Sequence, residues 1–293
     1  MIFAGFPARV KSGMPGCAPR MRFSARGLVR GALFACKAGG ICLHVAFTAM
    51  DAENVKNYFC KTEVVCDYAR AVTRVGLWES EKLVFGKYLE PGWRVLELGC
   101  GAGRIAHGLS LIGFGNVVGT DFSPAMVEVA RAIAADSGGC AEFRVEDATG
   151  LSFADSSFDA AVFGFNGIMQ IPLRRRRRLA MSEAARVLRP GGIFIFTTHD
   201  RDAPRNAAYW RAERESWAEG TQHSALDEFG DICYESGCGE LFIHSPSRAE
   251  VREDASSAGF GILLEKKRSE IAFEPQTVRE FSDECVFWVC QKK

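Results

Sequence analysis

From Glu90 onward, short apolar runs that suit β-strands alternate with stretches of helical periodicity. The strand-like runs are Trp93–Leu98, Val117–Asp121, Glu142–Glu146, Asp159–Phe165 and Ile193–Thr198. The helical patterns between them cover Ala102–Ile112, Pro124 to about Asp136, and Arg174–Leu188. This alternation predicts βαβ units and a parallel sheet with helices on both faces.

The C-terminal part continues the pattern. Ser247 is a good N-cap for a helix that ends at Gly259, and the runs Gly261–Lys266 and Val286–Cys290 predict a terminal hairpin. The total is about seven strands. No repeat of 20 to 50 residues is visible, which excludes a solenoid or a propeller.

The sequence Glu97-Leu98-Gly99-Cys100-Gly101-Ala102-Gly103 follows the first strand directly. Glycines at a strand-to-helix turn let the backbone approach a ligand closely, and open α/β sheets bind ligands at this end of their strands. A dinucleotide fingerprint would need a further glycine where Arg104 stands, so the spacing argues against a pyrophosphate.

Two acidic residues follow the next two strands. Asp121 ends the second strand, where a carboxylate can accept hydrogen bonds from ribose hydroxyls. Asp147, followed by Ala148, ends the third strand, where it can accept a hydrogen bond from an adenine amino group. The ends of three strands are therefore predicted to bind one adenosine-like ligand.

Residues 85–200 resemble class I S-adenosylmethionine-dependent methyltransferases of the methyltransferase type 11 kind. Four segments are similar to the successive motifs of that family: VLELGCGAGR, GTDFSPAMVEVAR, VEDATGLSFADSSFDAAVFGFNGIMQIP and VLRPGGIFIFTTHD. The resemblance implies an α/β, Rossmann-like, doubly wound sheet of seven strands with the last one antiparallel. It also implies S-adenosyl-L-methionine as the cofactor.

By this resemblance, the glycine turn flanks the methionine moiety, Asp121 the ribose and Asp147 with Ala148 the adenine, and Asn166 lies on the far side of the pocket. The full expected cofactor-binding set is Glu97, Gly99, Cys100, Gly101, Gly103, Asp121, Phe122, Asp147, Ala148 and Asn166. Each has a structural alternative: the aspartates can cap helices, Asn166 can satisfy backbone groups, and Cys100 is better explained as a small filling residue than as a nucleophile.

Methyl transfer from a sulfonium mainly requires alignment, so few catalytic side chains are needed. If the acceptor loses a proton, His199, Asp200 and His244 are weak candidates for the base, each with a structural role as the alternative. Tyr68 precedes the first strand on a helix, and N-terminal helices of related enzymes fold over the donor as a lid. The ring of Tyr68 is expected either to contact the sulfonium or simply to pack against the sheet.

An insertion follows the fifth strand. Residues 200–245 hold ten acidic residues against four arginines, and Trp210 and Trp217 share one helical face beside Tyr209. An acidic aromatic cap at the mouth of the site suits a small acceptor and opposes a nucleic acid. The alternative is a solvated helix that only packs its tryptophans.

The run Arg174–Arg178 is the one feature that favours nucleic acid. Five consecutive residues of a helix spread around its whole circumference, so a solvated helix start is the preferred interpretation. The overall charge agrees, because 36 basic and 36 acidic residues cancel.

The first fifty residues carry seven basic residues and no acidic residue, and Met50 opens a segment of ordinary composition. This leader is either an organelle transit peptide or upstream sequence read from an early start codon, and we favour the second. Lys37 and His44 interrupt its most apolar stretch, which argues against a membrane span. The eleven cysteines contain no CxxC pair, so free thiols in a reducing cytoplasm are expected, with no metal site.

We therefore expect a cytoplasmic methyltransferase that acts on a small-molecule acceptor, without nucleic-acid or membrane partners. An RNA or protein methyltransferase and a non-catalytic donor-binding protein remain the alternatives. The expected regions are a leader outside the fold (1–49) and a methyltransferase domain (50–293), divided into a helical lid (50–88), a donor-binding core (89–200), an acidic aromatic cap (201–246) and a C-terminal helix and hairpin (247–293).

Overall fold

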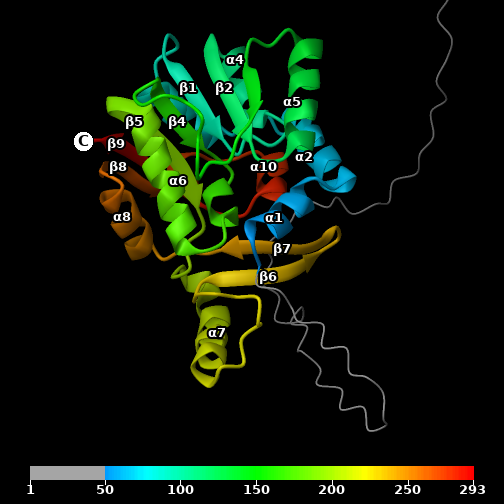
Figure 1. Ribbon diagram of the computed structural model, residues 1–293, viewed down its shortest axis with the longest axis vertical. Coiled ribbons are helices and arrows are strands. Elements are labelled where there is room, and N and C mark those ends of the chain that lie inside the picture. Colours follow the sequence, from blue (N-terminus) through cyan, green and yellow to red (C-terminus); the bar gives the residue numbers. More distant parts are fainter. Residues whose placement is uncertain (1–49) are drawn as a thin grey trace, which may run out of the picture.

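The computed structural model describes residues 50–293, so the expectations for the basic leader lie outside the described residues. A seven-stranded sheet with the order β3-β2-β1-β4-β5-β9-β8 forms its centre (Figure 1). The strands are β1 (Arg94–Leu98), β2 (Asn116–Asp121), β3 (Glu142–Val145), β4 (Phe158–Phe163), β5 (Leu188–Thr198), β8 (Phe260–Lys267) and β9 (Val286–Lys292). The strands from β3 to β5 are parallel, and β9 is antiparallel to both neighbours, which confirms the predicted fold.

Helices cover both faces of this sheet. On one face, α3 (Glu79–Tyr88), α4 (Arg104–Leu111) and α5 (Pro124–Ser137) pack against strand residues such as Val95. On the other face, α6 (Arg174–Val187) and α8 (Arg248–Ser257) pack against Leu96 and its neighbours. Alternate residues of each strand thus enter opposite cores, as the two-residue period of a strand requires.

Local sequence signals fix the ends of several elements. The Ser123 hydroxyl accepts a hydrogen bond from the Met126 amide and caps α5, with Pro124 in the first turn. The fifth strand begins earlier than predicted, at Leu188, because Pro190 and the following glycines form an irregular start of β5 rather than a separate turn.

The sequence predicted a helix with Trp210 and Trp217 on one face of the insertion, but it did not predict a second sheet there. After the short helix η2 (Pro204–Asn206) come α7 (Ala207–Glu219) and a two-stranded sheet of β6 (Asp231–Ser236) and β7 (Gly239–His244). In the view of Figure 1, β6 and β7 run below the main body of the protein, and α7 projects downward from them. Farther along, β8 and β9 pair as expected, and α9 (Arg268–Ile271) and α10 (Gln276–Phe281) lie between them in sequence.

Two N-terminal helices, α1 (Ala52–Phe59) and α2 (Thr62–Arg74), lie at the carboxyl ends of the strands (Figure 1). Val55 and Phe59 pack in one cluster with Met126 of α5 and Phe242 of β7. These helices therefore lie between the main sheet and the insertion. Within residues 50–293, no helix is long and apolar enough to cross a bilayer.

Candidate active site

The turn between β1 and α4 is held closely between aromatic rings. Gly99 and Gly101 have φ values of 61° and 53°, which favour glycine. A Cβ atom on Gly99 would lie 2.7 Å from the Phe163 ring, and one on Gly101 would lie 2.8 Å from the Tyr68 ring. Both positions therefore need a residue without a side chain.

Asp121 ties the end of β2 to this turn. Its Oδ2 accepts a hydrogen bond from the Gly101 amide and its Oδ1 accepts one from the Ser123 amide, both at 2.9 Å. Burial raises the pKa of this carboxyl group to about 6, although the two amide hydrogen bonds oppose the shift.

A second buried carboxyl group lies nearby. Glu97 Oε2 accepts a hydrogen bond of 2.7 Å from the Ala106 amide in the first turn of α4. Burial raises the pKa of Glu97 to about 8, and the Ala106 amide and Arg104 oppose the shift. Because both acids are poorly solvated, a positively charged ligand would favour their ionised forms.

These residues line one cavity, which we call the strand-end pocket. Its empty space is about 1110 Å³, including the open mouth. Eight of the ten expected cofactor-binding residues line it: Glu97, Gly99, Cys100, Gly101, Asp121, Phe122, Asp147 and Ala148. Gly103 lies behind the turn against Phe143, and Asn166 lines a different cavity.

Asp147 connects this pocket to the arginine run. Its Oδ1 accepts hydrogen bonds from the amide and hydroxyl of Thr149, and its Oδ2 lies 3.1 Å from Arg176 Nη2. Arg176 itself lines the strand-end pocket. Its Nε is buried without a hydrogen-bond partner within the described chain. This role of Arg176 could not be predicted from the run of arginines, because the spacing alone indicates a helix surface and does not show which carboxylate lies nearby.

The expected lid divides into two parts. Ala52, Val55 and Phe59 of α1 and Tyr68 and Ala71 of α2 line the strand-end pocket. In contrast, α3 belongs to the main core, where Trp78 and Phe85 are fully buried.

A buried ion pair joins α3 to the helix that follows the glycine turn. Arg104 Nη1 and Nη2 each lie 2.7 Å from a carboxylate oxygen of Glu81. The guanidinium also lies 4.9 Å from the centre of the Trp78 ring. This bidentate pair was not predicted from the sequence. It holds the Arg104 side chain at the wall of the strand-end pocket.

A smaller cavity, the second pocket, adjoins the first. It is lined by Tyr68, Phe165, Asn166, Gln170, His199, Tyr234, Ile243, Phe281, Ser282 and Asp283, with about 400 Å³ of empty space including its opening. Tyr68, Phe165, Gln170 and Phe281 line both pockets, so these side chains lie between the two spaces. The β6–β7 hairpin, through Tyr234 and Ile243, is the part of the insertion that reaches this site.

His199 is the candidate base that lies in the second pocket. Its Nδ1 is 3.1 Å from the Glu284 carbonyl oxygen, which can only accept, so this nitrogen carries the hydrogen and Nε2 is left as an acceptor. Burial is the main cause that lowers the pKa of His199 to about 4; Arg205 and Arg268 lower it further, and the hydrogen bond to Glu284 opposes the shift. The ring is therefore neutral at physiological pH.

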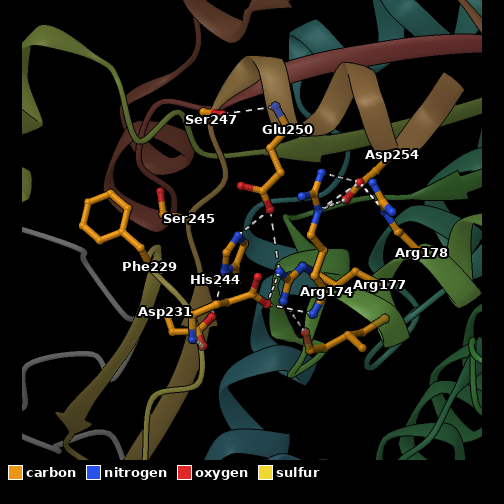
Figure 2. A network of polar contacts seen from close by, with 12 residues as sticks. Arg174, Arg177, Arg178, Phe229, Asp231, His244, Ser245, Ser247, Glu250 and Asp254 are labelled. Atoms are coloured by element: carbon orange, nitrogen blue, oxygen red, sulfur yellow. Dashed lines mark hydrogen bonds and ion pairs between the residues drawn. The ribbon is translucent and has the colours of Figure 1, made fainter. Parts of the chain in front are cut away.

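The structure places the other two base candidates elsewhere. Asp200 is paired with Arg248 at 2.8 Å and lines a third cavity outside both pockets. His244 is fully buried, with Nδ1 2.7 Å from Asp231 and Nε2 2.8 Å from Glu250 (Figure 2). Since both ring nitrogens are already bonded, His244 has none left to accept a proton from a substrate.

Glu228, His244 and Glu250 are close enough together to hold a metal ion. However, Glu228 Oε1 already accepts hydrogen bonds from the Arg174 amide and Arg177 Nη2, both at 2.7 Å. Hydrogen bonds and ion pairs within the protein thus satisfy this cluster (Figure 2).

The arginine run is also largely neutralised. Arg174 and Arg178 both bind Asp254 of α8 (Figure 2). Both also bind Glu253, and Arg177 binds Glu228. These contacts with acidic partners oppose the binding of a polyanion. The interpretation of the run as a simple solvated helix start is therefore wrong for these arginines.

The acidic aromatic cap differs from the expected arrangement. Trp210 and Trp217 both pack against Phe229. The centre of the Phe229 ring lies 5.6 Å from that of Trp210 and 6.4 Å from that of Trp217. Within the described chain, no residue of α7 lines either pocket. The tryptophans therefore pack within the insertion, which was the alternative to a role in binding. The β6–β7 hairpin, and not α7, borders the second pocket.

Comparisons with known proteins agree with this geometry. A family model for a methyltransferase domain matches residues 95–192, which contain β1 to β4 and the start of β5. Among solved structures, a SAM-dependent methyltransferase from Methanosarcina mazei has 25% sequence identity and a TM-score of 0.58, and the match covers 74% of this chain and 99% of that one.

Curated relatives match over a shorter part of the chain. The ubiquinone/menaquinone biosynthesis C-methyltransferase of Bdellovibrio bacteriovorus is 35% identical over 146 residues, which are 48% of this chain and 59% of that protein. The demethylmenaquinone methyltransferase of Symbiobacterium thermophilum is 30% identical over 149 residues, which are 48% of this chain and 57% of that protein. The chain thus spans less than two thirds of the length of these relatives.

Proposed function

Because this chain carries a class I S-adenosylmethionine-dependent methyltransferase domain, we propose that it transfers a methyl group to a small-molecule acceptor bound in the second pocket. The observation that supports this proposal most strongly is that Tyr68 and Phe165 line both pockets. A donor in the strand-end pocket and an acceptor in the second pocket would meet there.

The residues of the strand-end pocket suit the cofactor. The glycine turn leaves room that a side chain would fill, and the Asp121 carboxylate can accept hydrogen bonds from hydroxyl groups in addition to those from the two amides. Glu97 and Asp121 have raised pKa values because burial leaves their charges poorly solvated, and a cationic ligand would relieve this cost. Bound S-adenosylmethionine supplies an activated methyl group on a positively charged sulfur.

The protein's own part in the reaction would be alignment and exclusion of water. Tyr68 of α2 is partly buried and lines both pockets, so its ring can contact both ligands. Holding donor and acceptor in line can supply most of the required acceleration, since the methyl group is already activated. His199 is the one candidate base near the acceptor, and its neutral ring can accept a hydrogen bond from it.

A small acceptor is favoured over a macromolecule. The second pocket is bounded by Tyr68, Tyr234 and Phe281, and most of the arginine run is bound to acidic side chains. The names of the two curated relatives also refer to small quinone-type molecules.

Calorimetry with S-adenosylhomocysteine, the product form of the cofactor, tests the donor site. Asp121→Ala should weaken binding by about 10- to 100-fold, because hydrogen bonds to a charged group contribute about 1.5–3 kcal/mol. Asp155→Ala, which changes a carboxylate whose side chain is 76% exposed, is the matched control and should change nothing. Absence of binding to folded protein, or equal affinity in wild type and Asp121→Ala, would contradict the proposal.

Methyl transfer needs a separate measurement. The full chain is incubated with labelled S-adenosylmethionine and a panel of small acceptors, and release of S-adenosylhomocysteine is followed. Release that depends on an acceptor supports an enzyme. Tight cofactor binding without release for any acceptor would instead favour a donor-binding protein, and preferential release with bulk RNA would favour the nucleic-acid alternative.

A further inference from the structure

We propose that His244 is a positioning residue, which holds the β6–β7 hairpin in place as a wall of the second pocket only while its ring is an imidazolium. The role of this wall in acceptor binding rests on the proposed function. The inference adds the group that fixes the wall, and it makes the order of the hairpin depend on a single proton.

The β6–β7 hairpin reaches the second pocket through Tyr234 of β6 and Ile243 of β7. At the base of the hairpin, Asp231 begins β6 and is paired with His244 at the end of β7. Since His244 directly follows Ile243, the contacts of its ring fix the end of the strand that carries this part of the pocket wall.

The ring of His244 lies between two carboxylate groups (Figure 2). Its Nδ1 is 2.7 Å from Asp231 Oδ1, and its Nε2 is 2.8 Å from Glu250 Oε1. Asp231 belongs to the hairpin, whereas Glu250 lies in the first turn of α8, which packs against the main sheet. The ring therefore ties the base of the hairpin to the body of the protein.

The Asp231 carboxylate accepts hydrogen bonds on both of its oxygens. Oδ2 accepts them from the backbone amides of Asp227 and Glu228, at 3.1 and 3.0 Å, and Oδ1 faces His244. The side chain of Asp231 is only 1% exposed, so water does not supply other donors. A carboxylate oxygen can only accept, and Nδ1 of His244 must therefore donate.

Glu250 is the carboxylate on the other side of the ring. Burial opposes its ionisation, but the hydrogen bond from His244 and the charges of this ring and of two arginines lower its pKa overall. Arg201 Nη2 lies 3.5 Å from Glu250 Oε2, and Arg177 Nη2 lies 3.7 Å from Oε1. Because ionised Glu250 can only accept, Nε2 of His244 must also donate. With both nitrogens donating, the ring is an imidazolium.

The charges around the ring balance only when the ring is protonated. Its charged neighbours come from the segment before β6, from β6, from α8, from α6 and from the segment after β5: Glu228, Asp231, Glu250, Arg177 and Arg201. Farther out, Asp227 lies near Asp231 and Arg175. The ring thus faces three carboxylates with two guanidinium groups among them, and the imidazolium supplies the third positive charge.

Loss of the proton turns one of the two ring contacts into a repulsion. A neutral ring keeps one hydrogen, so its other nitrogen presents a lone pair to a carboxylate oxygen less than 3 Å away. A buried carboxylate that loses its partner is strongly destabilising. Movement of the hairpin base away from α8 relieves this contact, and Ile243 moves with it.

The first test observes the ring directly. Nuclear magnetic resonance of the full chain, labelled with ¹⁵N in its five histidines and measured with EDTA present, shows whether each ring nitrogen carries a hydrogen. The His244→Gln spectrum identifies the signals of His244. We expect both nitrogens to be protonated at pH 7, and a neutral His244 ring at this pH would overturn the inference.

The second test follows the hairpin by hydrogen exchange and mass spectrometry from pH 6 to 10. Protection factors of the amides of residues 231–244, corrected for the intrinsic effect of pH, are compared with those of β1. Protection of the hairpin should stay constant while the ring is charged and fall about 10- to 100-fold over the pH interval in which the ring loses its proton. Loss of the proton without this fall would overturn the inference.

Two variants on α8 separate charge from packing. Glu250→Gln replaces the carboxylate by an amide, which can donate to a neutral ring, so protection of the hairpin should no longer follow the charge of His244. Glu253→Gln is the matched control, because Glu253 is 61% exposed and binds Arg174 and Arg178, and it should keep the wild-type dependence. The same dependence in wild type and Glu250→Gln would overturn the inference.

His244→Gln separates the second pocket from the donor site. It should lower the protection of the hairpin about 10- to 100-fold at pH 7. The affinity for S-adenosylhomocysteine should stay within about threefold, because within residues 50–293 no hairpin residue lines the strand-end pocket. An equal loss of cofactor affinity would mean a general structural role and would overturn the assignment.

These outcomes distinguish the two proposals. If S-adenosylhomocysteine fails to bind to the wild type, the proposed function fails, and the resonance experiment still decides the state of His244. If S-adenosylhomocysteine binds and Asp121→Ala weakens it, but the His244 ring is neutral, only the inference about His244 fails.

Discussion

The strand-end pocket and the second pocket share Tyr68 and Phe165 but are assembled differently. The polar groups of the strand-end pocket follow three neighbouring strands, within residues 97–148. The second pocket combines side chains from α2, the ends of β4 and β5, the short helix η1 (Gly167–Gln170), the β6–β7 hairpin and residues 281–283. Local chain geometry therefore determines the strand-end pocket, whereas long-range packing determines the second pocket.

Among the substitutions in the strand-end pocket, Gly101→Ala should lower the affinity for S-adenosylhomocysteine most. The added Cβ would lie 2.8 Å from the Tyr68 ring at a residue with φ of 53°, so the ring and the turn must shift. Strain of about 1–3 kcal/mol predicts a roughly 10- to 100-fold loss of S-adenosylhomocysteine affinity by calorimetry. Gly113→Ala is the control, because Gly113 also has a positive φ but nothing within 4 Å of its Cβ position. Equal losses in both variants would mean that the close approach to Tyr68 is unimportant.

The pH dependence of cofactor affinity should be the next largest effect. With a pKa of about 6, the Asp121 carboxyl group is ionised above neutral pH and becomes protonated at lower pH. The affinity for S-adenosylhomocysteine should therefore fall up to roughly 10-fold from pH 7 to pH 5, and Asp121→Asn should remove this decrease, whereas a change above pH 7 belongs to Glu97, whose pKa is about 8. A profile that does not change between wild type and this variant would assign the titration to another group.

The Asp121 carboxyl group should also affect stability. Its ionisation favours cofactor binding but lowers the free energy of unfolding of the ligand-free protein. Burial raises its pKa in the folded protein above the ordinary value of 3.8, so the folded state binds the proton more tightly than the unfolded chain does. The free energy of unfolding of the ligand-free protein should therefore decrease as pH rises from about 4 to about 6. Denaturant titrations of wild type and Asp121→Asn at several pH values measure this contribution.

Arg176→Gln should have a smaller effect, at the edge of the strand-end pocket. Arg176 holds Asp147 at 3.1 Å, and partly exposed pairs contribute about 0.2–1 kcal/mol. We expect a loss of up to about 5-fold in S-adenosylhomocysteine affinity. Arg175→Gln removes an exposed neighbour of the same type and should leave the affinity unchanged. No loss in Arg176→Gln would show that Asp147 needs no support.

The smallest effect is expected on α7. Trp217 contacts Phe229 and lines neither pocket, so Trp217→Ala should leave the affinity for S-adenosylhomocysteine and the acceptor-dependent release of S-adenosylhomocysteine within about twofold. Tyr234→Ala on the hairpin, which changes a residue of the second pocket, should lower that release without weakening S-adenosylhomocysteine binding. If Trp217→Ala lowers the release more than Tyr234→Ala does, the proposed boundary of the acceptor site must be extended to α7.

The sequence predicted the main sheet and the strand-end residues because their signals are local. The glycines of the turn and Asp121 each follow an apolar strand directly, so their meeting needs only a parallel sheet. The Glu81–Arg104 pair could not be predicted in this way, because its partners come from different helices. The strand β6 was missed because Asp231, Cys233 and Glu235 interrupt its apolar pattern.

The two histidines show the same limit at the level of single residues. His199 and His244 both follow or end apolar runs, and the sequence offered no reason to separate them. The structure does separate them: carboxylates of Asp231 and Glu250 bind both ring nitrogens of His244, whereas a single ring contact, from Nδ1 to the Glu284 carbonyl, is seen for His199 within residues 50–293. These differences come from tertiary partners, which no local pattern contains.

The position of β9 has a consequence for biosynthesis. This strand contains residues 286–292, yet it lies between β5 and β8 and buries Trp288 completely. During translation, the ribosome releases β5 long before its partner, so β5 remains an open edge with apolar faces until the final residues of β9 emerge. The sheet is therefore completed only after β9 has been synthesised, and nascent chains that stop before residue 286 should depend strongly on chaperones.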